Sequence, residues 1–157
     1  IINGLFLFVP MATSLIILHS QNRLLVLFLL VLIWAADIGA YFSGKRFGYK
    51  KLCPEVSPNK TLAGLYGGLI LAQVVAISYV YIIVQAPSAK DFFVFSVLAL
   101  VVSLVSVLGD LFESLLKRIS GNKDSGNILP GHGGLLDRID SLTSSAPIFF
   151  LFLVFVL

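Results

Sequence analysis

The chain has 157 residues, of which 58% are hydrophobic and only 12% are charged, and its mean hydropathy is +1.00. A soluble domain of this length needs many more charged side chains to cover its surface, so the composition indicates an integral membrane protein. The net charge is only +3 and the chain contains no nucleic-acid-binding motif, so nucleic acid is not expected as a partner.

Hydropathy divides the chain into long apolar runs separated by polar segments. A helix needs about 20 apolar residues to cross the hydrocarbon, and the strands of a membrane barrel would be about half as long. We therefore predict an all-α polytopic membrane bundle with about five spans. In chain order the predicted spans are Ile1–Leu18, Leu24–Phe42, Gly64–Val84, Phe92–Phe112 and a last one that begins at Ala146. The third opens with small residues (GLYGG), which favour close helix packing.

The longer polar segments are predicted to be loops, at about residues 43–63 and 113–145. Two crossings separate them, so both lie on the same side of the membrane. Nine of the eleven Lys and Arg residues fall in these two loops. This bias predicts that both loops face the cytoplasm.

The ends of the sequence suggest a piece of a longer protein. The chain starts at Ile1 without an initiator Met and stops inside an apolar run shorter than a span. The domain prediction is therefore one transmembrane catalytic domain over residues 1–157, forming part of a longer chain.

The longest polar interval is Ser114–Asp140, with the sequence SLLKRISGNKDSGNILPGHGGLLDRID. It combines four basic residues, three aspartates, a histidine and five glycines between apolar runs. A segment that only joined two helices would not need this chemistry. We therefore interpret the interval as the active site.

Carboxylates at membrane depth are the sharpest indication of a site. Asp37 and Asp110 lie inside predicted spans, where an ionised carboxylate costs a few kcal/mol unless it is paired or faces a polar cavity. Asp137 and Asp140 are three residues apart, on one face of a short helix predicted after the PGHGG turn, and Asp110 and Glu113 share that spacing. Oxygen ligands converging from two helices suit Mg²⁺, although such acidic pairs also occur on solvated helix faces.

Glycines and basic residues in the same interval suit phosphate. Gly131, Gly133 and Gly134 surround His132 ahead of a helix start, where exposed N–H groups favour anions. A proline-constrained turn at Ser57–Thr61 (SPNKT) is predicted to carry Lys60 toward the same surface. The cations Lys117, Arg118, Lys123 and Arg138 could neutralise a polyphosphate, or could anchor the protein to anionic lipid head groups.

These segments resemble the phosphatidate cytidylyltransferases, also called CDP-diacylglycerol synthases. The resemblance rests first on the fixed spacing of Ser114–Asp140, which includes Lys123-Asp124 and His132-Gly133-Gly134. It extends to Asp37–Gly48, Ser57–Thr61 and Gly109–Ser114. It covers most of the chain, which is similar to the C-terminal catalytic half of such an enzyme. One departure is Ala63, where the family usually has an acidic residue before the glycine that would support Lys60 or a metal-bound water.

The resemblance implies a nucleotidyltransferase that converts CTP and phosphatidic acid to CDP-diacylglycerol and pyrophosphate with Mg²⁺, and it leaves a second cation and a homodimer open. It implies metal ligation by Asp110, Asp137 and Asp140, and catalytic roles for these three with Lys117 and His132. It implies that the substrate-binding residues are Ser57, Lys60, Arg118, Lys123, Asp124, Gly133, Gly134 and Arg138. The expected location is the bacterial inner membrane, with the active site facing the cytoplasm.

Two other functions remain open at this point. A CTP-dependent polyprenol or phytol kinase needs the same nucleotide, metal and lipid acceptor, but it releases CDP rather than pyrophosphate. An ion transporter or channel would explain Asp37 and would leave the GHGG turn without a purpose.

Overall fold

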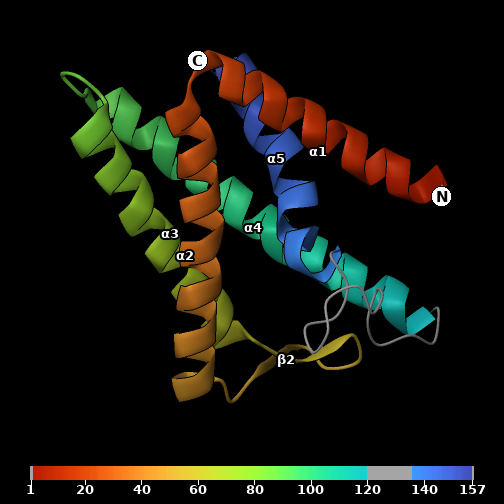
Figure 1. Ribbon diagram of the computed structural model, residues 1–157. Helices are drawn as coiled ribbons and strands as arrows, with labels where there is room; N and C mark the ends of the chain where they lie inside the picture. The colour runs from red at the N-terminus through yellow and green to blue at the C-terminus, as the bar shows by residue number, and fades with distance from the viewer. Residues whose placement is uncertain (1, 120–135, 157) are drawn as a thin grey trace.

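The protein is a bundle of long helices with one small hairpin (Figure 1). The computed structural model describes residues 2–119 and 136–156, and the side chains of residues 7–119 and 139–156. The helices are α1 (Ile2–Gln21), α2 (Arg23–Phe47), α3 (Leu62–Ile83), α4 (Ala89–Ile119) and α5 (Leu136–Val156), and strands β1 (Lys51–Cys53) and β2 (Ser57–Thr61) join α2 to α3. Within the described residues, α2, α3, α4 and α5 are long and apolar enough to cross a membrane, and α1 contributes a shorter apolar segment, Leu7–Gln21. The predicted all-α membrane bundle is confirmed.

The helix ends differ from the prediction. Helix α2 continues to Phe47, α4 continues to Ile119, and α5 begins at Leu136 rather than at Ala146. The short helix expected after the PGHGG turn is therefore the first part of α5. Hydropathy marks only the length that lies in hydrocarbon, whereas backbone hydrogen bonding continues beyond it. Basic pairs in the last turns of α2 and α4 favour this extension, because they face the negative end of each helix dipole.

The loop expected at residues 43–63 contains a hairpin that the sequence analysis did not predict. Strands β1 and β2 pair antiparallel, with Lys51 opposite Thr61 and Cys53 opposite Ser57. The predicted turn at SPNKT is thus wrong: these residues form β2. Pro58 is tolerated there because, within the described residues, β2 pairs only with β1 and is an edge strand. Thr61 ends the strand and caps α3, its Oγ1 accepting the Gly64 N–H at 3.0 Å.

Helices α2 and α3 touch through glycines, as the GLYGG segment predicts. A methyl group built on Gly39 would lie 2.5 Å from the Gly67 carbonyl oxygen, and one on Gly68 would lie 2.7 Å from that of Ala36. Close approach of this kind is how helices associate in a bilayer, where lipid gives no hydrophobic drive to pair them. The contact fixes the relative positions of Asp37, on α2, and the hairpin that enters α3.

An aromatic cluster joins the helices at the other half of the bundle. The ring of Phe28 stacks on Tyr79 with centroids 4.2 Å apart, and it also meets Phe95 at 5.8 Å and Phe149 at 5.9 Å. These four residues belong to α2, α3, α4 and α5, so the cluster ties all four long helices together. The polar cavity described below lies at the opposite, hairpin end.

Replacing Gly68 by Val is expected to destabilise the bundle by about 1–3 kcal/mol, because the added side chain meets backbone that cannot rotate away. Thermal unfolding in detergent should show a lower melting temperature. Ser78→Val is the matched control, since Ser78 is exposed on the same helix. Equal melting temperatures for Gly68→Val and the parent would contradict the close contact.

Candidate functional site

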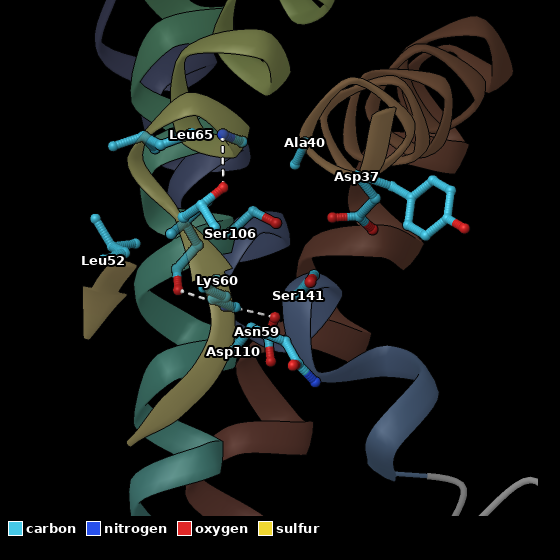
Figure 2. Close-up of a pocket in the computed structure, with 13 residues that line it drawn as sticks. Asp37, Ala40, Leu52, Asn59, Lys60, Leu65, Ser106, Asp110 and Ser141 are labelled. Atoms are coloured by element: carbon cyan, nitrogen blue, oxygen red, sulfur yellow. Dashed lines mark hydrogen bonds and ion pairs between the residues drawn. The ribbon is translucent and has the colours of Figure 1, made fainter. Parts of the chain in front are cut away.

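A cavity of about 200 Å³ lies where the hairpin meets α2, α3, α4 and α5. Three charged residues line it, Asp37, Lys60 and Asp110, and each comes from a different element (Figure 2). The polar residues of its wall are Tyr41, Asn59, Thr61, Ser106 and Ser141. A polar cavity surrounded by membrane-spanning helices is a setting for chemistry at the bilayer surface.

Lys60 and Asp110 form the central ion pair. Lys60 Nζ lies 2.5 Å from Asp110 Oδ2 and also donates to the Val107 carbonyl oxygen at 3.3 Å. The two side chains are 22% and 36% exposed, so the pair is only partly screened by solvent. Strand β2 therefore places the Lys60 ammonium group beside Asp110 of α4. This positive charge compensates the carboxylate, which would otherwise be costly at this depth.

Asp37 faces the same cavity from α2 (Figure 2). It lies close enough to interact electrostatically with both Asp110 and Lys60. It also lines a second cavity, between α2 and the start of α5, together with Asp140. Asp37 is therefore part of one electrostatic system with the ion pair.

Helix α5 brings Asp140 to Asp110. Their carboxyl groups lie within hydrogen-bonding reach of each other, and Glu113 is near enough to add its own field. Asp140 Oδ1 also accepts the Ser141 N–H at 2.7 Å. Two carboxylates this close repel each other, and a cation placed between them relieves that repulsion. Lys60 alone does not balance this negative charge.

The Asp110–Asp140 pair fits part of a magnesium site. Mg²⁺ prefers oxygen ligands, and it is usually held by one or two carboxylates together with waters and substrate phosphates. Among the described side chains, no group of three or more His, Cys, Asp or Glu residues is arranged to hold a metal ion. The side chain of Asp137, the third expected ligand, lies outside the described residues. The three-aspartate metal site stays a prediction.

The other predicted residues on α4 and the hairpin lie beside the cavity rather than in its wall. Lys117 Nζ lies 2.8 Å from Glu113 Oε1, one turn earlier on α4. Arg118 Nε donates to the Val56 carbonyl oxygen at 3.4 Å, which places the end of α4 against the hairpin. Ser57 is half-buried at the start of β2. The remaining predicted site residues, Lys123, Asp124, His132, Gly133 and Gly134, and the side chain of Arg138, lie outside the described residues.

Sequence reasoning did not assign Asn59, Ser106 or Ser141 to the site, although all three line the cavity. Their positions in the sequence, close to predicted site residues, could have indicated them. Ser106 stands one turn before Asp110 on the same face of α4, and Asn59 and Ser141 are the chain neighbours of Lys60 and Asp140. Asp37 was singled out as a costly carboxylate without being given a role in the site.

The fold and the cavity together define a polytopic membrane protein with an acidic, lysine-bearing pocket at one end of its helix bundle. The model of the cytidylyltransferase family matches residues 2–156, so the chain belongs to that family.

Curated relatives agree with this assignment. The chain is 50% identical over 137 residues to a phosphatidate cytidylyltransferase of Haemophilus influenzae, covering 85% of this chain and 46% of the relative. It is 47% identical over 148 residues to that of Pseudomonas aeruginosa, covering 93% and 54%. It is 48% identical over 126 residues to that of Bacillus subtilis, covering 80% and 46%. The chain thus spans about half the length of the curated relatives it matches.

The cap residue Thr61 offers a test of how the site is held. Its hydroxyl caps α3 and lies against Gly44 of α2, where an added methyl would be 2.9 Å away. We expect Thr61→Val to destabilise the protein by about 1 kcal/mol, as loss of an N-cap does, and Thr61→Ser to preserve most of the stability. Denaturant titration in mixed micelles measures both. Equal loss in the two variants would show that the hydroxyl is not the stabilising group.

Proposed function

We propose that this chain carries the catalytic site of a phosphatidate cytidylyltransferase. The enzyme would convert CTP and phosphatidic acid to CDP-diacylglycerol and pyrophosphate at the cytoplasmic face of a bacterial inner membrane. The observation that carries the proposal is the Lys60–Asp110 pair beside Asp140 in a cavity among membrane-spanning helices. The names of the relatives supply the substrate class. The excess of Lys and Arg at the hairpin end supports the orientation.

The reaction is a displacement at phosphorus. An oxygen of the phosphatidate phosphate attacks the α-phosphorus of CTP, a new P–O bond forms, and the bond to the β-phosphate oxygen breaks so that pyrophosphate leaves. Because this nucleophile is already anionic near neutral pH, the site needs no strong general base. The main barrier is electrostatic, since one anion must approach another, so the chain must supply positive charge where negative charge develops.

Lys60 is the described residue best suited to this task. It is held at two points, by Asp110 and by the Val107 carbonyl, so its ammonium group is oriented before substrate arrives. Its remaining donor capacity can be offered to an incoming phosphate oxygen. In the proposal, Lys117, Arg118, Lys123 and Arg138 add phosphate contacts, Ser57 and Asp124 line the substrate site, and His132 with Gly133 and Gly134 shapes the nucleotide pocket.

The carboxylates have a complementary role. Asp110 and Asp140 would hold Mg²⁺ through their oxygens, with Asp137 as the third ligand of the proposal. Bound there, Mg²⁺ would neutralise phosphate charge and stabilise the pyrophosphate leaving group. Asp37, facing the same cavity, raises the negative potential that draws a divalent cation into the site.

Turnover of labelled CTP by the full-length protein tests the proposal. With phosphatidic acid present, the label should appear in lipid and pyrophosphate should be released. Release of CDP with a phosphorylated alcohol would instead favour the kinase. Lys60→Met should lower turnover by about 10²–10³-fold, the usual loss when one group stabilising developing charge is removed.

Lys90→Met is the matched control, because Lys90 is exposed at the start of α4, about 30 Å along the helix from Asp110. This variant should turn over like the parent. Similar turnover in Lys60→Met and Lys90→Met would exclude Lys60 from the reaction.

A further inference from the structure

Gly109, the residue before Asp110, sits in unusually close contact with α5. A methyl group built on Gly109 would lie 2.1 Å from Ser144 Oγ, 2.7 Å from Ser144 Cβ and 3.6 Å from the Asp140 carbonyl oxygen. Carbon atoms in ordinary contact stand about 3.5–4.0 Å apart. Rotating Ser144 could move its hydroxyl away but not its Cβ. No side chain larger than hydrogen therefore fits at residue 109 unless α5 moves away from α4.

Ser144 and Ser145 fasten α5 to the backbone of α4 at the same place. Ser144 Oγ lies 3.3 Å from the Val105 carbonyl oxygen and 3.2 Å from that of Ser141. Ser145 Oγ, fully buried, donates to the Val102 carbonyl oxygen at 3.5 Å. Ser145 is buried and Ser144 is half-buried, so little solvent competes for these bonds, and they favour one rotation and one height of α5.

The contact is coupled directly to the carboxylates. Ser144 lies one turn after Asp140 on the same face of α5, and Gly109 is bonded to Asp110. The closeness of Gly109 to Ser144 therefore sets the separation of the two carboxyl groups. A catalytic constellation tolerates displacements of only about 0.5 Å, and relieving a 2.7 Å carbon contact requires more than that.

We propose that Gly109 and Ser144 are positioning residues that set the distance between Asp110 and Asp140. Neither touches substrate. The Ser144 side chain packs against Gly109, where there is no side chain, and this contact places the two aspartates opposite each other across the α4–α5 interface. The catalytic consequence rests on the proposed function, whereas the geometric consequence does not.

The first test is a rescue experiment on the full-length protein in membrane vesicles. Gly109→Ala should lower turnover by up to about 100-fold, the scale expected for a misplacement near 1 Å, and should raise the Mg²⁺ concentration needed for half-maximal rate. Adding Ser144→Gly removes both clashing atoms, so the double variant should recover most of the turnover and the parent's Mg²⁺ requirement. A double variant as poor as Gly109→Ala would overturn the proposal. If Gly109→Ala instead lowers the yield of folded protein, the added Ser144→Gly should restore that yield, and failure to restore it would also overturn the proposal.

The second test measures proximity without any turnover. In a Cys53→Ser background, which removes the native cysteine, Asp110→Cys and Asp140→Cys are combined and oxidised with copper–phenanthroline. Cross-linking within the chain should be fast with Gly109, much slower with Gly109→Ala, and restored by Ser144→Gly. Equal cross-linking rates with Gly109 and Gly109→Ala in folded protein would refute the positioning role. Because this readout needs no substrate, it stands even if the proposed reaction is wrong.

Discussion

The arrangement of this site depends on one interaction: the Lys60 ammonium group lies among several carboxylates. Lys60 pairs with Asp110 while Asp37 and Asp140 lie within electrostatic reach of the same pair. Placing a charged group inside a membrane bundle costs several kcal/mol of free energy unless the group is paired or exposed to water. Among the described side chains, bringing these carboxylates around one lysine leaves an excess of negative charge, which favours the binding of a further cation. In the proposed function, substrate and metal supply that cation.

Two glycine contacts between helices bring these carboxylates close to Lys60. At one, α2 and α3 approach through Gly39 and Gly68, which sets Asp37 against the hairpin that carries Lys60. At the other, α4 and α5 approach through Gly109, which sets Asp110 against Asp140. Each carboxylate thus belongs to a helix whose position is set by a close glycine contact rather than by long side chains. The aromatic cluster around Phe28 holds the opposite half of the same four helices together.

Much of this could be predicted from the sequence, and the failures have physical causes. Apolar runs predicted the helices, and the cost of burying Asp37 and Asp110 indicated that each is paired or faces a polar cavity; Asp110 pairs with Lys60, and both aspartates line the same cavity. Helix ends were misplaced because hydropathy stops at the hydrocarbon boundary while the helices continue. The hairpin was missed because SPNKT has the composition of a turn, and only pairing with β1 makes it a strand. Contacts such as Gly109 with Ser144 depend on the relative rotation of two helices, which no local pattern encodes.

The most direct measurement is the binding of Mn²⁺, as a paramagnetic substitute for Mg²⁺, in the presence of a non-hydrolysable CTP analogue. Electron paramagnetic resonance of the full-length protein would compare the parent with Asp140→Asn and with Glu55→Gln, an exposed hairpin carboxylate on the same side of the membrane. We expect the nucleotide-dependent Mn²⁺ affinity to fall at least about tenfold in Asp140→Asn and to stay unchanged in Glu55→Gln. Equal affinities in the parent and in Asp140→Asn would contradict the claim that these carboxylates gather to hold a divalent cation against the nucleotide.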